Sequence, residues 1–266
     1  MTQHKAVAAL VLAASVAVSA CDAVTGTSSG SPIGVGGVAA RTKGAGFTTA
    51  PQIAFYRVSG ANFVTADGVR DTCFLAAYSE ASSGTTTASA LSAGAFITIG
   101  IGSRIDSLTR IGGSLDPTYR STLAAGIPYT PGDSMVITVP GDRAGFPAST
   151  FRGKTAEAFT MTPLVVPASG NPINLTWTPA SDLHAAMFVT FRYTTGTATS
   201  FNRQIACSFL DDGSGQVPAT VAADWMLAVN RDMTAQRLRS ILMQIDVPLS
   251  YFNVVSTFDR PTPVSP

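Results

Sequence analysis

The sequence predicts an all-β protein whose mostly antiparallel strands pack as β-sandwiches. Three observations support this prediction. Charged residues make up only 12% of the chain, about half the usual share, which suits an exported β-protein better than a cytosolic helical enzyme. Short runs of residues with strand character recur along the chain. Gly, Pro, Asp and Asn separate these runs at the spacing expected of a sandwich.

A leader precedes the predicted sandwiches. Lys5 supplies a positive start, and the apolar run that follows over residues 6–18 is too short to span a bilayer as a helix. The run ends in Val18-Ser19-Ala20-Cys21, which resembles the lipobox of lipoprotein precursors. We therefore expect residues 1–20 to be a signal peptide and Cys21 to be the acylated first residue of the mature chain. The alternative, an ordinary secretory leader before a chance cysteine, stays open.

Acylation of Cys21 would make a lipid bilayer the first partner of this chain. Each buried methylene group contributes about 0.8 kcal/mol, so several acyl chains would hold the domain on a membrane surface. We expect a lipid-anchored protein of the bacterial cell envelope, on either the inner or the outer membrane. Loss of Lys5 with the leader leaves sixteen of the 17 basic residues against 16 acidic ones. This neutral balance argues against nucleic acid as a partner.

Composition and the positions of turn-forming residues divide the rest of the chain. Residues 21–50 hold the lipidated cysteine and are rich in small residues, which predicts a flexible tether. An extended piece at residues 163–172 predicts a boundary between two sandwiches, one over residues 51–165 and the other over 166–260. Residues 261–266 form a tail. A single larger sandwich would show a similar spacing of turn-forming residues, so that alternative stays open.

The clearest predicted strands combine apolar residues with flanking turn signals. They are residues 52–59, 70–78, 95–102 and 134–139 in the first half, and 171–178, 185–194, 203–210 and 251–258 in the second.

One stretch, residues 222–244, does not read as a strand. Its side chains favour helices, which predicts one short helix there. The residues that indicate it are Met233, Gln236, Arg237, Arg239 and Leu242.

The two remaining cysteines fit an exported protein. With Cys21 acylated, Cys73 and Cys207 are left as an even pair, each inside a strand-like run. They either form a disulfide or serve as two small buried hydrophobic residues. Sequence does not show whether their α-carbons come within the limit of about 7 Å for a bridge, so both possibilities stay open.

Residues with catalytic or metal-binding chemistry are few. His184 is the one histidine after the leader, which rules out any site with two histidine ligands. A Ser-His-Asp triad would have to use it with Asp182 and a distant serine, without a recognisable oxyanion hole. Asp211 and Asp212 lie on a Gly-bearing loop that either binds calcium or forms a simple hairpin turn. No catalytic residue and no cofactor is assigned.

Several aromatic residues allow two interpretations. They could form a flat face for sugar rings or lie in the core, and the core is favoured for Trp177 because it alternates with Leu175. Trp225 is the less certain case. The residues concerned are Trp177, Trp225, Tyr193, Tyr251 and Phe252.

Several short motifs resemble a group of exported proteins and lipoproteins of environmental bacteria that have no assigned activity. These motifs are the strand with Cys73, Leu91-Ser-Ala-Gly94, Tyr129-Thr-Pro-Gly-Asp133, Leu175-Thr-Trp-Thr-Pro179, and Cys207 followed by Asp211-Asp-Gly213 and Val217-Pro218. The resemblance covers most of the mature chain and implies immunoglobulin-like or related sandwiches. It implies no activity and no catalytic residues.

Two functional hypotheses follow. The favoured one is a non-enzymatic, membrane-anchored envelope lipoprotein that binds an envelope protein or a glycan, or that plays a structural part at the cell surface or in the periplasm. The alternative is a hydrolase acting on polysaccharides or esters. That enzyme would need two carboxylates about 5–10 Å apart, or a serine beside His184.

Overall fold

The computed structural model describes residues 31–43, 46–58, 71–78, 88–112, 118–245 and 250–261. The predicted signal peptide, Cys21 and residues 262–266 lie outside these ranges. Strands hold 59% of the described residues and the described helix is short, which confirms the all-β prediction. Its elements are β1 (Ser31–Lys43), β2 (Gly46–Thr49), β3 (Gln52–Val58), β4 (Thr72–Ala77), β5 (Ala88–Ala90), β6 (Phe96–Ile101), β7 (Arg104–Ile111), β8 (Thr118–Ser121), β9 (Ile127–Tyr129), β10 (Ser134–Val139), β11 (Ser149–Lys154), β12 (Ile173–Thr176), β13 (Ala185–Tyr193), β14 (Arg203–Leu210), β15 (Ser214–Val217), α2 (Ala219–Leu227), β16 (Arg231–Ile245) and β17 (Ser250–Pro261).

Fifteen of the described strands join in one large sheet. Its main path runs β11-β10-β6-β7-β8-β3-β1-β17-β16-β13-β14-β4, while β12 and β15 form a small separate sheet. The sheet is mixed, because β1 and β17 pair in parallel and the other described pairs are antiparallel. The prediction of two separate immunoglobulin-like sandwiches is therefore not supported. Strands assigned to different sandwiches are hydrogen-bonded in one sheet.

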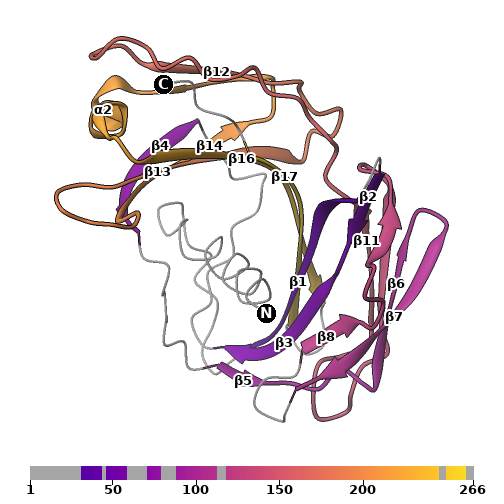
Figure 1. Ribbon diagram of the computed structural model, residues 1–266. Coiled ribbons are helices and arrows are strands. Elements are labelled where there is room, and N and C mark those ends of the chain that lie inside the picture. Colours follow the sequence, from indigo (N-terminus) through magenta and orange to yellow (C-terminus); the bar gives the residue numbers. More distant parts are fainter. Residues whose placement is uncertain are drawn as a thin grey trace.

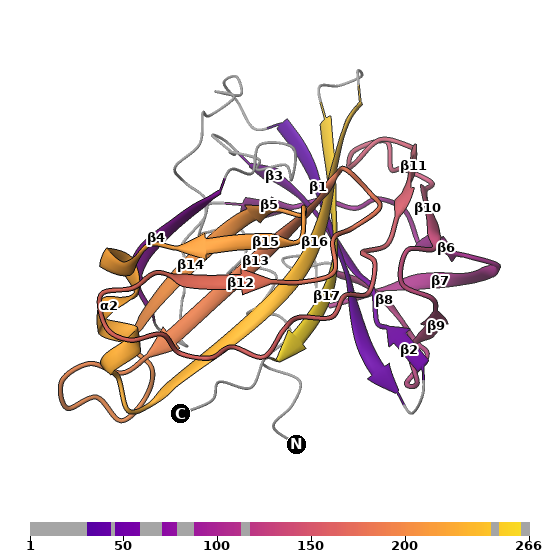
Figure 2. The same cartoon turned by 90° about the horizontal axis from the view of Figure 1, so that it is seen from above.

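Two large hydrophobic cores lie against this sheet, and a third, small buried cluster around Ala186 and Leu238 lies on its other face. One lies between β13, β14 and β16 and the layer made by β12, β15 and α2, and it contains Phe191, Phe209 and Trp225. The other lies between β1, β3 and β17 and the layer made by β6, β10 and β11, and it contains Phe55 and Phe252. Figure 2 shows these two covering layers on opposite sides of β1, β16 and β17. Each layer thus buries one stretch of a shared sheet.

The long strands explain why two sandwiches do not separate. On β17, Phe258 belongs to the first core and Phe252 to the second, so one strand serves both. The chain passes from the second core to the first between Phe151 and Ala156, about ten residues before the boundary predicted at 163–172. Because the two ends of β17 are buried in different cores, the two cores share one strand and are not separate domains.

The predicted tether is wrong over part of its length, because β1 and β2 fall within residues 21–50. β1 is a central strand, hydrogen-bonded to β3 on one side and β17 on the other. A Cβ on Gly34 would lie 2.6 Å from Phe252 Cδ2 and 2.7 Å from Phe55 Cε1. The small residue here reflects close packing against two aromatic rings and not backbone flexibility.

The prediction of one short helix within residues 222–244 is correct only for the first residues of that stretch. α2 ends at Leu227, and most of residues 222–244 form β16, where Met233, Ala235 and Arg237 alternate into the first core. Pairing of β16 with β13 on one side and with β17 on the other thus outweighs the helix preference of its side chains. The eight strands predicted most clearly are all present, as β3, β4, β6, β10, β12, β13, β14 and β17. Within the described ranges, no helix is both long and apolar enough to cross a membrane.

Candidate functional site

A disulfide joins Cys73 and Cys207. The two residues lie directly opposite each other on the antiparallel strands β4 and β14, with their α-carbons 4.1 Å apart. β4 is an edge strand of the main sheet, so the bridge fastens this edge covalently to its neighbour. Such a bond is consistent with an extracytoplasmic protein.

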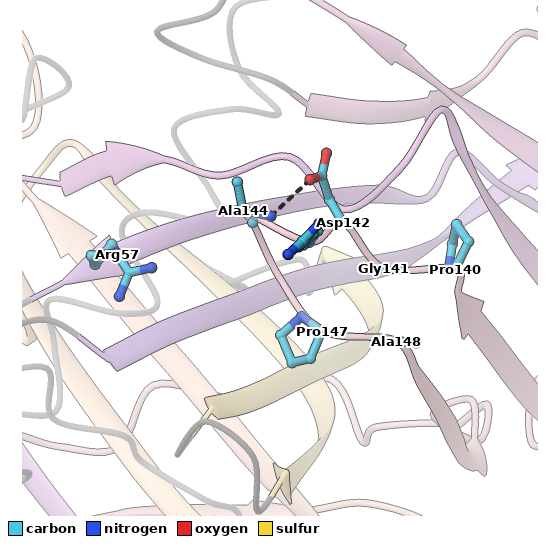
Figure 3. Close-up of a pocket in the computed structure, with 9 residues that line it drawn as sticks. Arg57, Pro140, Gly141, Asp142, Ala144, Pro147 and Ala148 are labelled. Carbon is cyan, nitrogen blue, oxygen red and sulfur yellow. Dashed lines mark hydrogen bonds between the residues drawn. The ribbon is translucent and has the colours of Figure 1, made fainter.

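A cavity of about 660 Å³ lies beside the loop between β10 and β11 (Figure 3). Its lining combines Arg57, Arg143 and Asp142 with prolines, glycines and alanines of the loop. Hydrogen bonds from the Ser92 hydroxyl and from the backbone N–H of Ala144 lower the pKa of Asp142. This carboxylate therefore holds its own loop.

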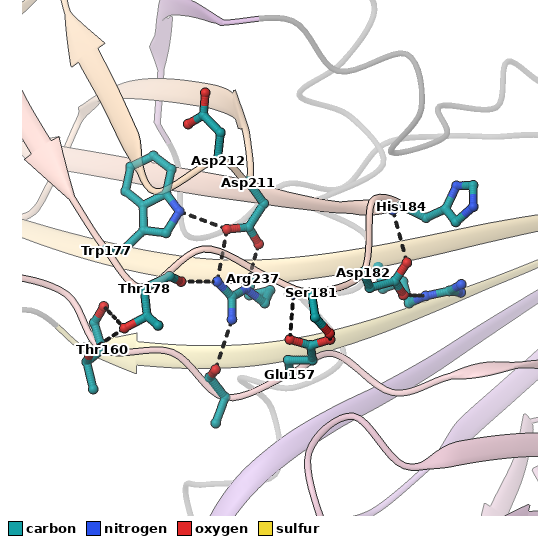
Figure 4. A network of polar contacts seen from close by, with 12 residues as sticks. Glu157, Thr160, Trp177, Thr178, Ser181, Asp182, His184, Asp211, Asp212 and Arg237 are labelled. Carbon is teal, nitrogen blue, oxygen red and sulfur yellow. Dashed lines mark hydrogen bonds and ion pairs between the residues drawn. The ribbon is translucent and has the colours of Figure 1, made fainter.

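The most buried polar network centres on Arg237 of β16 (Figure 4). Its guanidinium donates from Nε to Asp211 Oδ2 at 2.5 Å and from Nη2 to Asp211 Oδ1 at 2.9 Å, and the two side chains are only 1% and 2% exposed. It also donates to the carbonyl oxygens of Ala158 and Thr178. Arg237 therefore ties the sheet to two segments that cover the first core.

This network engages one of the two aspartates for which the sequence left calcium binding and a hairpin turn as alternatives. Asp211 Oδ1 accepts a second hydrogen bond from Trp177 Nε1 at 2.8 Å, so both of its oxygens are already engaged. Asp212 Oδ1 accepts from the backbone N–H of Ser214 at 3.1 Å, which closes the turn between β14 and β15. Among the residues that the structure describes, no group of three or more His, Cys, Asp or Glu side chains is placed to hold a metal ion.

The loop before β13 shows why a catalytic triad is not supported. Asp182 forms an ion pair with Arg239 and accepts from the backbone N–H of His184, while Figure 4 shows the imidazole turned away from this carboxylate. Burial acts to raise the pKa of Asp182, but the bonds from Arg239 and His184 outweigh it and lower that pKa. Asp182 thus shapes the loop and does not orient the imidazole.

Ser181 also takes part in a structural contact. Its hydroxyl donates to Glu157 Oε1 at 2.5 Å, and its backbone N–H donates to Glu157 Oε2 at 3.0 Å. Burial acts to raise the pKa of Glu157, but these two hydrogen bonds outweigh it and lower that pKa. The carboxylate is an ionised anchor for the loop, which is unsuited to accept a proton near neutral pH.

The aromatic residues proposed as a sugar-binding face lie mostly in the cores. Trp177 is 6% exposed, and Trp225, Tyr193 and Phe252 are more deeply buried. The core interpretation is confirmed for Trp177. The flat-face interpretation is wrong for these four residues, because a buried ring cannot stack on a ligand. Tyr251 differs, because it is half-buried and alternates with Phe252 onto the other face of β17.

That other face of the sheet is concave. Figure 1 shows the path from β4 through β17 to β3 bending around the side that faces away from both cores. Because successive side chains of a strand point to opposite faces, residues that alternate with the core positions line this concave face. At the β4 end they are Phe74, Tyr78, Phe188, Thr190, Arg192, Gln204, Ala206, Asp232, Thr234 and Gln236.

A charged pair lies at this end of the concave face. Arg192 of β13 stands directly opposite Asp232 of β16, and on its other side it stands opposite Gln204 of β14. Arg192 Nε and Asp232 Oδ1 are both buried atoms without a hydrogen-bond partner among the described residues. Burial raises the pKa of Asp232, although the charge and the backbone N–H of Arg192 act to lower it.

Sequence reasoning did not single out Arg192 and Asp232, nor did it give Arg237 a role as a site residue. Arg237 could have been found by reading β16 as a strand, because it falls in register with the buried Met233 and Ala235. The pairing of Arg192 with Asp232 depends on the register between β13 and β16, which joins residues forty positions apart in the sequence.

No protein-family model matches the chain, and no curated protein matches it. The resemblance to exported lipoproteins therefore remains an expectation.

Proposed function

We propose that this chain is a lipid-anchored protein of the bacterial cell envelope that acts by binding and carries out no chemical reaction. In this proposal, acylated Cys21 holds the protein on a membrane, and the folded sheet presents a partner-binding surface. The partner is an envelope protein or a glycan. The order of charged residue, apolar run and lipobox in residues 1–21 supports the anchor.

One observation supports binding above catalysis. The polar groups closest to a catalytic constellation, in the loop with Ser181, Asp182 and His184, are engaged in contacts that hold the loop in place. The carboxylates of Glu157 and Asp182 both have lowered pKa values. A general base at neutral pH needs a pKa near the working pH, and these shifts move both groups away from it. The loop is thus built for stability.

The disulfide supports the exported location in this proposal. Disulfides persist in the periplasm and outside the cell, whereas cytosolic thiols are kept reduced. The bond between Cys73 and Cys207 joins an edge strand to the sheet. Its formation therefore provides a test of export that is independent of the lipid.

The experiment compares three precursors in intact cells: the wild type, Cys21→Ser, and Cys21→Ser behind an ordinary secretory leader. A fatty-acid analogue reports acylation, and crosslinking followed by mass spectrometry identifies what co-purifies. We expect label and membrane retention in the wild type alone, and a defined envelope component recovered when the protein is anchored. Equal labelling of Cys21→Ser would contradict the anchor. A purified domain that hydrolyses ester or glycoside substrates, and loses this activity in His184→Ala, would replace binding by the hydrolase hypothesis.

A further inference from the structure

We propose that the cavity between Arg57 and the loop joining β10 to β11 is a binding site for an acidic polysaccharide, held by its carboxylate or phosphate groups. This inference rests on the proposed binding function and names the class of ligand. The cavity has a volume of about 660 Å³, and Arg57 and Arg143 are both among its lining residues. Figure 3 shows Arg57 facing the loop across this cavity. Ligand sites commonly have volumes of about 300–1,000 Å³, so this one has room for a sugar unit.

Packing in the second core brings the two walls of the cavity together. Along β3 the side chains of Ile53, Phe55 and Arg57 share one face, because they are two residues apart. Phe146 of the loop is fully buried, and its ring centre lies 4.4 Å from that of Phe55. This contact holds the loop over the end of β3. Arg57 and Arg143 therefore line one cavity although they are far apart in the sequence.

The loop is a preformed wall. The backbone N–H of Gly141 donates to the Ala93 carbonyl oxygen at 3.1 Å. That of Phe146 donates to the Ser92 carbonyl oxygen at 2.8 Å. A Cβ on Gly145 would lie 1.9 Å from the same Ser92 oxygen, so only glycine fits at this contact. Because these contacts fix the loop before a ligand arrives, binding would order little further structure.

The cavity carries an excess of positive charge. Its lining contributes two guanidinium groups and one carboxylate, on Asp142. That carboxylate already accepts hydrogen bonds from the Ser92 hydroxyl and the Ala144 N–H, which lower its pKa, and the charge of Arg110 acts in the same direction. A chain whose charges nearly balance thus gathers cations at one cavity, and such a local field attracts anions.

Arginine chemistry selects an oxyanion. A guanidinium is planar and can donate two parallel hydrogen bonds to a carboxylate or a phosphate, which adds direction to the attraction of charge. Arg57 on β3 and Arg143 on the loop would hold such a group from two walls. A neutral polysaccharide would gain no ion pair here, and a cationic one would meet two like charges.

The rest of the lining suits a sugar chain. Pro140 and Pro147 add apolar ring surfaces, on which the C–H groups of a sugar ring can pack. Arg57 and Arg143 are exposed, as are Pro140 and Asp142. These groups are therefore within reach of a long polymer as well as of a small ligand.

The experiment measures affinity of the folded mature protein for soluble polysaccharides, by affinity electrophoresis and calorimetry. Alginate supplies carboxylates, with its propylene glycol ester as the uncharged counterpart. Phosphomannan supplies phosphates, with mannan freed of phosphate as the counterpart, and chitosan is the cationic probe. The site variants are Arg57→Gln and Arg143→Gln. Arg104→Gln and Arg203→Gln are the matched controls, because they remove the same charge from exposed residues that do not line the cavity.

We expect saturable binding of alginate or phosphomannan, with affinity lowered about tenfold or more in the site variants and unchanged in both controls. Thermal unfolding of each variant shows that it is folded, which separates loss of the site from loss of the fold. Equal affinity for an uncharged counterpart, preference for chitosan, or the same loss in site and control variants would overturn the inference. If neither acidic probe binds while crosslinking from cells recovers an envelope protein, the acidic-glycan site is wrong and the proposed binding function survives. Hydrolysis of a probe would defeat both.

Discussion

Arg237 and Asp211 form a two-point ion pair inside the protein, with Nε to Oδ2 at 2.5 Å and Nη2 to Oδ1 at 2.9 Å. Trp177 Nε1 donates to the same carboxylate, and the remaining guanidinium nitrogen donates to Ala158. A buried charge is tolerated when hydrogen-bonding partners surround it, and here all three guanidinium nitrogens donate. The pair connects β16 to the loop after β14 and to the segment before β12.

Arg237→Ala should lower the free energy of unfolding by about 3–5 kcal/mol, because it leaves the Asp211 carboxylate buried and uncompensated. Arg237→Lys should recover little, since an ammonium group cannot make the two-point contact. Urea unfolding measures both, with the exposed Arg203→Gln as control. A change below about 1 kcal/mol in Arg237→Ala would place the pair in the weak class of surface ion pairs.

Loss of the disulfide should destabilise the fold. The bond closes a loop with a sequence separation of 134 residues, and removing such a bridge costs about 2–5 kcal/mol. The double variant Cys73→Ser/Cys207→Ser and the reduced wild type should show the same loss in chemical unfolding. Mass spectrometry of alkylated protein verifies the pairing. An oxidised protein with two free thiols at these positions would contradict it.

Gly34 tests whether β1 is part of the sheet. Gly34→Val should destabilise the protein by about 1–3 kcal/mol or more, because the added atoms meet Phe252 and Phe55 at under 3 Å. Gly36→Ala is the milder comparison, since its nearest contact would be 3.3 Å to Val254. Thermal unfolding measures the difference. Wild-type stability in Gly34→Val would show that this segment is a tether after all.

Asp232→Asn should raise stability at neutral pH. Burial raises the pKa of Asp232 in the folded protein, so folding disfavours its ionised form, and stability is lost as pH rises through the folded pKa. The neutral amide avoids this loss, and its advantage should disappear toward acid pH, where the carboxyl group is protonated. The groups that act on Asp232 are Arg192 on β13 and the backbone N–H of the same residue.

Asp182→Asn should behave in the opposite way. Burial opposes ionisation of Asp182, but Arg239 and the backbone N–H of His184 lower its pKa overall. Its stabilising contribution is therefore present above the unfolded-state pKa and lost as pH falls through the folded one. Asp182→Asn should lower the melting temperature at neutral pH and match the wild type in acid. Parallel pH profiles for Asp182→Asn and Asp232→Asn would refute at least one of the two assignments.

The sequence predicted strands best where apolar residues alternate between turn signals. Residues 134–139 and 203–210 correspond to β10 and β14 without any shift. β1 was missed because its glycines, which close packing requires, make its composition similar to that of a flexible tether. β16 was misread because Met, Gln, Arg and Leu favour helices locally, whereas pairing with β13 and β17 decides the outcome.

The candidate site was harder to predict than the fold. Interpreting residues 185–194 as a strand predicts that the side chain of Arg192 points to the other face of the sheet from Phe191 and Tyr193. It does not identify which residue lies opposite Arg192 on the neighbouring strand. Asp232 becomes its neighbour only through the register of β13 and β16. By contrast, Trp177 could be assigned to the core from alternation with Leu175 alone, and the structure confirms that assignment.

The central claim is that this protein binds an envelope component and does not degrade it. The most direct test incubates the folded mature domain with an envelope polysaccharide fraction, and follows both protein retention and fragment release by sedimentation and mass spectrometry. The account predicts saturable retention on a polymer whose mass distribution is unchanged. Release of new reducing ends or free acids by the wild type, abolished in His184→Ala, would contradict it.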